Sequence, residues 1–154
     1  MGDIIATLCF IAAGSLATAA AIEDTRTHLL RNIYTLPIIA IALIGLTGAA
    51  QVDDLGIRAV LTDMAIGAAW FAGPWLITHL IAPSQIGFGD IKLSAGLGLY
   101  IGWLNPSLGL LGFFATCLAF GATALIAKAA SRDQLPFGPA IVVGAAVAVA
   151  LGIL

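Results

Sequence analysis

Two aspartates stand beside long apolar runs, and their residue type suits proton-transfer chemistry. Asp24 lies in "AIEDTRTHLLRN" and Asp90 in "SQIGFGDIKLSAG", directly after two glycines in a GxGD pattern. Two carboxyl groups held close together cannot both ionise cheaply, so they share one proton and their pKa values separate. The charged member can then activate a water molecule while the protonated member donates to a carbonyl oxygen. This chemistry requires elements that bring Asp24 and Asp90 together.

The composition requires a lipid bilayer as solvent for most of the chain. Of the 154 residues, 61% are hydrophobic and 9% are charged, and the mean hydropathy is +1.10. A soluble domain carries about 25% charged residues, so this chain cannot cover a water-facing surface. Cys9 and Cys117 stand alone in apolar runs, which indicates small buried side chains and no disulfide or zinc site. The sequence indicates no cofactor, no metal and no nucleic-acid partner.

The apolar runs predict an all-α bundle of six transmembrane helices in one domain, residues 1–154. A spanning helix needs about 20 mostly apolar residues. Charged residues separate most runs, and the proline of "NPS" at 105–107 divides the longest. The first run lacks a basic cluster before it, so we interpret it as a retained span rather than a signal peptide. The predicted spans are residues 4–22, 32–52, 64–89 (starting near 59), 91–104, 107–127 and 139–154.

The basic residues predict an orientation, because lysine and arginine are retained on the cytoplasmic side of a membrane. Five of them lie in the connections after the first, third and fifth spans: Arg26, Arg31, Lys92, Lys128 and Arg132. Only Arg58 lies on the opposite side. Both termini are therefore expected on the extracytoplasmic side. Asp24 and Asp90, at the ends of the first and third spans, are expected at the cytoplasmic boundary and at similar depth.

Glycines 87 and 89 allow another backbone to approach Asp90, as a polypeptide ligand would require. The alternative is that they ease a turn while Asp90 caps the next helix. Farther along, Gly98 and Gly102 are four residues apart, which favours close helix packing in lipid.

The other ionisable side chains are weaker candidates. Glu23 adjoins Asp24, but neighbouring helical residues do not face the same way, so only one should face a partner. His28 and Asp133 are expected to be solvated, and His79 is expected to be a packed neutral histidine. The remaining aspartates fall on or near the opposite face: Asp3, Asp53, Asp54 and Asp63.

Three segments together resemble the type IV prepilin peptidases, the GxGD membrane aspartic proteases of bacteria. "IEDTRTHLLRNIYTLPI" is similar to their first motif, an aspartate followed by a polar loop and an asparagine or aspartate. "GFGDIKLSAGLGLYIGW" resembles the second motif, GxGDxKL followed by a glycine-rich helix, and "LPFGPAI" resembles the segment that opens the last helix. The resemblance covers nearly the whole chain in the right order.

The resemblance implies that Asp24 and Asp90 are the catalytic pair of a single aspartic peptidase domain. The implied reaction removes the short basic leader of prepilin-like proteins, just before an apolar N-terminal helix that stays in the lipid bilayer. The site would face the cytoplasm from the bacterial inner membrane. The implied substrate-binding residues are Gly87, Gly89, Lys92, Asn32, Pro136, Phe137, Gly138 and Pro139. For Lys92, a capping or headgroup-binding role is the alternative.

The chain departs from the family pattern at three points. Arg31 precedes Asn32 where many members have proline, and Gln85 stands where long members have an extra glycine. The paired CxxC motifs of long members are absent from this sequence, so the resemblance implies cleavage without N-methylation.

Three other classes of protein fit the sequence less well. Presenilin and signal-peptide-peptidase enzymes also use GxGD. In these enzymes, however, tyrosine precedes the first aspartate and the chain has about nine spans, whereas here Glu23 precedes Asp24 and six spans are predicted. A small ion- or proton-coupled transporter bundle would use the paired acids as an ion path, but favours acids near mid-membrane. A purely structural bundle needs no paired acids.

Overall fold

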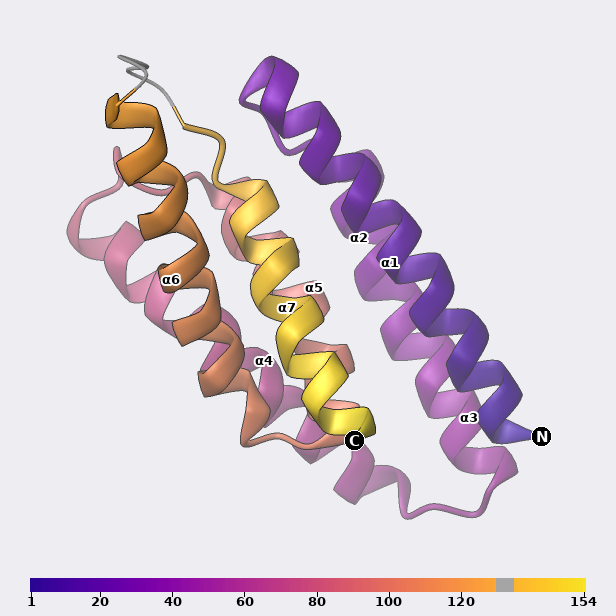
Figure 1. Cartoon of the computed structure of the whole chain (residues 1–154). Helices are drawn as coiled ribbons and strands as arrows, with labels where there is room; N and C mark the ends of the chain where they lie inside the picture. The colour runs from indigo at the N-terminus through magenta and orange to yellow at the C-terminus, as the bar shows by residue number, and fades with distance from the viewer. Residues whose placement is uncertain (130–134) are drawn as a thin grey trace.

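The computed structural model describes residues 1–129 and 135–154, and these residues form helices without a strand (Figure 1). Arg132 and Asp133 lie outside the described residues. The elements are α1 (Gly2–Thr27), α2 (Asn32–Ile41), the π-helix η1 (Ala42–Leu46), α3 (Thr47–Val52), α4 (Ile57–Ile81), α5 (Phe88–Leu104), α6 (Leu108–Ala129) and α7 (Gly138–Ile153).

Six helical segments result, because α2, η1 and α3 follow one another without a break. By length and composition, four segments can cross a membrane: Gly2–Thr27, Asn32–Val52, Ile57–Ile81 and Leu108–Lys128. Helix α7 is shorter and also apolar, and α5 has 17 residues. The prediction of an all-helical membrane bundle with six helices is confirmed.

The predicted boundaries of the first and third spans were wrong. Helix α1 continues through Asp24 to Thr27 and ends at His28, whose φ of 52° is left-handed and whose N–H donates to the Asp24 carbonyl at 2.9 Å. Helix α4 ends at Ile81 rather than 89, and turns lead to α5. Pro83 supplies the physical reason, because helices usually end before the residue that precedes a proline.

Helices α4 and α5 pack with their backbones in close approach, as the glycine spacing predicted. A Cβ atom added to Gly98 would lie 2.6 Å from the Ala68 Cα atom, and one added to Gly102 would meet the Asp63 carbonyl. Gly67 of α4 lies opposite both glycines. This contact fixes α5 against α4 and therefore fixes where α5 begins.

Both termini lie at one end of the bundle in Figure 1, whereas the α1–α2 connection, the α4–α5 turn and the start of α7 lie at the other. Asp53 belongs to the terminal end, because its Oδ1 atom accepts a hydrogen bond from the Gly2 N–H at 3.1 Å. Asp24, near the end of α1, and Asp90, at the start of α5, share the opposite end. We call this the site end.

Candidate functional site

Asp24 is held in the last turns of α1 by the first residue of α7. Its side chain is buried, with 5% of the residue exposed, and its Oδ2 atom accepts a hydrogen bond from the Gly138 N–H at 2.8 Å. A helix N-terminus favours negative charge, so this amide suits a carboxylate partner. A Cβ at residue 138 would lie 2.9 Å from Oδ2, so only glycine leaves this approach open.

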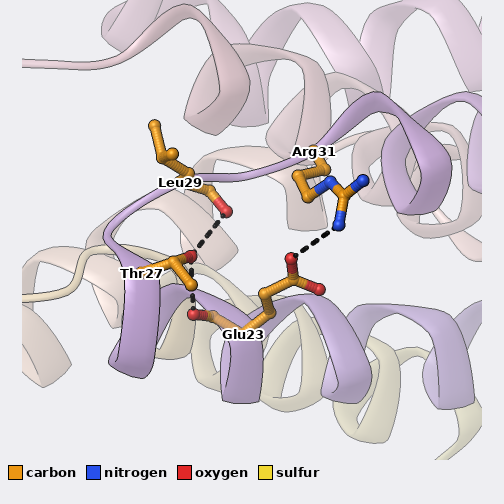
Figure 2. A network of polar contacts seen from close by, with 4 residues as sticks. All are labelled: Glu23, Thr27, Leu29 and Arg31. Carbon is orange, nitrogen blue, oxygen red and sulfur yellow. Dashed lines mark hydrogen bonds and ion pairs between the residues drawn. The ribbon is translucent and has the colours of Figure 1, made fainter.

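Glu23 faces away from this site and organises the α1–α2 connection instead (Figure 2). Its Oε1 atom pairs with the Arg31 guanidinium at 3.4 Å. The Thr27 hydroxyl donates to the Glu23 carbonyl at 3.0 Å and lies 3.5 Å from the Leu29 carbonyl. The expectation that only one of the two adjacent acids faces inward is therefore confirmed, and that acid is Asp24.

Asp90 lies in the first turn of α5 and bends back toward the residue before the helix. Its Oδ2 atom accepts a hydrogen bond from the Gly87 N–H at 3.1 Å. A Cβ at residue 87 would lie 3.0 Å from that oxygen, so glycine leaves room for the carboxyl group. Asp90 does cap the start of α5, and the carboxyl group remains partly accessible.

The two acids lie close enough to influence each other electrostatically. Asp90 precedes the apolar run that begins at Ile91 and therefore lies outside the segment 91–104 that the sequence predicts to span the membrane. Burial first, and then the negative charge of Asp24, raise the pKa of Asp90 to about 6, while the Gly87 hydrogen bond opposes this rise. A carboxyl group so placed carries its proton at a higher pH than an isolated aspartate.

Gly89 brings the α1–α2 connection onto the start of α5. A Cβ at residue 89 would lie 2.8 Å from the Leu30 Cβ and 3.0 Å from the Leu30 carbonyl oxygen. Leu30 follows α1 by three residues. The glycine therefore permits the backbone contact that joins the two acid-bearing segments. Its expected role in substrate binding stays a prediction.

Asn32 and Lys92 bind each other. The Lys92 ammonium donates to Asn32 Oδ1 at 2.8 Å and also lies 5.1 Å from the centre of the Phe88 ring. This pair connects the start of α2 to the first turns of α5. Both residues were expected to contact substrate, and in the structure they hold the site end together.

The "PFGP" segment contacts Asp24 itself and a residue next to Asp90. The Phe137 ring packs 4.9 Å from Trp75 and 4.8 Å from Phe120, measured between ring centres. Phe137 also packs against a small core that includes Ile91, the neighbour of Asp90. Since Gly138 binds Asp24, the segment touches both sides of the site. Its prolines flank this contact: Pro136 and Pro139.

His79 is a packed histidine, as expected. Its Nδ1 atom lies 2.8 Å from the Ile86 carbonyl, an acceptor, so Nδ1–H donates and fixes the α4–α5 turn. Ser94 was not among the site residues predicted from the sequence, and it lies one turn after Asp90 on the same face of α5. Ser94 is fully buried and its hydroxyl has no hydrogen-bond partner within residues 1–129 and 135–154. The four-residue spacing from Asp90 could have identified it.

No group of three or more His, Cys, Asp or Glu side chains in the described part of the chain could hold a metal ion.

Comparison with known proteins gives an independent view of this site. The model of the type IV leader peptidase family matches residues 10–127. A prepilin leader peptidase/N-methyltransferase of Dickeya chrysanthemi is 32% identical over 97% of this chain and 51% of its own length. The leader peptidase HopD of Salmonella typhimurium is 32% identical over 86% of this chain and 84% of its own length.

A further prepilin leader peptidase/N-methyltransferase, from Escherichia coli K12, is 27% identical over 80% of this chain and 54% of its own length. The chain thus spans about half the length of the first relatives it matches. No solved structure matches. The resemblance seen in the sequence motifs is confirmed, and the matched residues include Asp24 and Asp90. The chain belongs to the type IV leader peptidase family.

Proposed function

We propose that this chain is a membrane-edge aspartic endopeptidase that removes the short basic leader of prepilin-like proteins. Asp24 and Asp90 form its catalytic dyad at the cytoplasmic face of the bacterial inner membrane. Family membership and the names of the relatives support the substrate class. The positive residues at the site end support the cytoplasmic orientation, by the retention of lysine and arginine on that side.

In the proposed mechanism, the two carboxyl groups share one proton. Asp24, which accepts a hydrogen bond from the Gly138 N–H, is the ionised member and takes a proton from the attacking water. Asp90, whose pKa is raised to about 6, is the protonated member and donates to the carbonyl oxygen of the scissile peptide. Proton transfer by positioned side chains contributes about 10²–10⁴-fold to a rate.

One observation carries the proposal. Two acids that are 66 positions apart in the sequence lie at the same end of the bundle, where burial and then the charge of Asp24 raise the pKa of Asp90. The glycines around them let the protein's own segments close onto the acids: Gly87 and Gly89 beside Asp90, and Gly138 beside Asp24. The remaining predicted contacts, Asn32, Lys92, Pro136, Phe137 and Pro139, would then frame the site.

The test compares Asp24→Asn and Asp90→Asn separately during co-expression with a prepilin-type substrate that bears a basic leader. Each substitution removes one ionisable partner, so each is expected to reduce leader removal by at least about 10²-fold, as loss of a catalytic acid or base does in other enzymes. Asp54→Asn is the matched control, since Asp54 is exposed at the terminal end and its φ of 52° suits asparagine.

Membrane fractionation and protein level establish that all three variants insert. Normal leader removal by either dyad variant would overturn the proposal. The mass of the mature substrate also tests the expectation that this chain leaves the new N-terminus unmethylated, which stays a prediction.

A further inference from the structure

A groove between α1 and α7 runs along α1 and ends at residues that neighbour Asp24 and Gly138 in the sequence. Three cavities of about 480, 390 and 290 Å³ follow one another along it and share lining residues. The first two share Phe10 and Val149, and the second and third share Thr18 and Val142. Helices α1 and α7 lie next to each other in Figure 1, and both contribute lining residues to all three cavities.

The end of the groove is adjacent to the candidate catalytic site. Thr25 and Pro139 line its last cavity. Thr25 follows Asp24 in α1, and Pro139 follows Gly138, whose amide binds Asp24. An elongated ligand in the groove would therefore place its end at the turn of α1 that carries Asp24.

The dimensions of the groove suit a membrane-spanning helix. It follows α1 from Asp3 to Thr25, which corresponds to about 33 Å at a helical rise of about 1.5 Å per residue. The hydrocarbon core of a bilayer is about 30 Å thick. The groove thus extends across the depth that one transmembrane helix must cross.

The walls of the groove carry small residues that are exposed on the outside of the bundle. Gly14 and Thr18 of α1 are four residues apart, as are Ala146 and Ala150 of α7, and all four are exposed. A Cβ added to Gly14 would meet no atom within 4 Å. Small residues at this spacing let a second helix approach closely in lipid, whereas an acyl chain requires no such spacing.

We infer that the α1–α7 groove is the docking site for the apolar helix of the substrate, and that it delivers the bond before that helix to Asp24. The inference rests on the proposed function, which supplies a substrate with a leader followed by an apolar helix. The continuity of the groove with the acid site, its length and its small-residue walls select a helix as the occupant.

The first experiment fills the groove by Gly14→Leu and measures cleavage kinetics on a substrate that carries its apolar helix. The expected result is a rise in KM of about tenfold, equivalent to about 1.4 kcal/mol, with kcat changed less than about twofold. Gly121→Leu in α6 is the matched control, because Gly121 also has open space around its Cβ position and lies outside the groove. An unchanged KM for Gly14→Leu, or a loss confined to kcat, would overturn the inference.

The second experiment does not depend on cleavage. Gly14→Cys or Gly121→Cys is combined with Asp90→Asn and with Cys117→Ala, which removes the exposed native thiol. Cross-linking to single cysteines in the substrate helix is expected at residue 14 and not at residue 121. A missing cross-link at residue 14, with normal cleavage by the unsubstituted protein, would mean that lipid fills the groove and would overturn the inference.

The two proposals fail separately in this design. A cross-link at residue 14, together with no leader removal by the unsubstituted protein, would support the groove and reject the peptidase. Neither cross-link nor cleavage would reject both.

Discussion

At the scale of single residues, Gly87 controls both the space beside the Asp90 carboxyl group and one of its hydrogen bonds. Its φ of −70° and ψ of 145° are compatible with proline, which would remove the N–H donor. Because this donor stabilises the charged carboxylate, it holds the pKa of Asp90 below the value that burial and Asp24 would otherwise produce.

The proposed dyad predicts that activity declines as pH rises through the pKa of Asp90. With that pKa raised to about 6, Asp90 is protonated below this value and loses its proton above it. The alkaline limb of kcat/KM, which reports the free enzyme, should therefore lie near pH 6. Gly87→Pro should move this limb to higher pH relative to Gly87→Ala, because both add a Cβ but only proline removes the N–H. An alkaline limb that is the same in both variants would contradict this assignment.

At the scale of elements, glycine lets α4 and α5 pack closely enough to set the position of Asp90. The same device recurs where Gly89 meets Leu30 and where Gly138 meets Asp24. In each case the missing side chain admits a neighbouring segment, so the site end is assembled by backbone contacts as much as by side chains.

The α4–α5 contact predicts opposite effects for the same substitution at two glycines. Gly98→Ala places a Cβ 2.6 Å from the Ala68 Cα and should destabilise the fold by about 1–3 kcal/mol through overpacking. Gly121→Ala meets open space and should stabilise α6 by up to about 1 kcal/mol, because alanine favours helix over glycine. Thermal unfolding in one detergent measures both. A Gly98→Ala protein that is as stable as the Gly121→Ala protein would refute the close packing.

Hydropathy, charge and glycine spacing are local, so the sequence could predict the helical class, the six segments, the shared end of the two acids and the Gly98 contact. The rotation of each helix about its axis is not local. The Gly138–Asp24 and Lys92–Asn32 hydrogen bonds join residues 114 and 60 positions apart, so no pattern within one run indicates them. The end of α4 was predictable from Pro83, but the apolar run beyond it favoured a longer span.

At the scale of the whole molecule, the charges differ between the two ends of the bundle. Arg26, Arg31, Lys92 and Lys128 belong to the site end, and among the described residues only Arg58 supplies a basic side chain at the terminal end. This asymmetry is the physical basis for the proposed orientation, with the acids facing the cytoplasm.

The orientation predicts which engineered thiols react from outside the cell. Ser84→Cys at the site end and Ser107→Cys at the terminal end replace exposed serines, and each is combined with Cys117→Ala. In spheroplasts, a membrane-impermeant thiol reagent should label Ser107→Cys at once and Ser84→Cys only after permeabilisation. The reverse pattern would invert the proposed topology.

The hydrogen bond from Gly138 to Asp24 has a consequence for biogenesis, because it joins α1, the first helix, to α7, the last. While the ribosome is still making α6, the Gly138 N–H that donates to the Asp24 carboxylate has not yet been synthesised. The acid site is therefore completed only when α7 enters the membrane, and a nascent chain that stops before Gly138 remains without its finished centre.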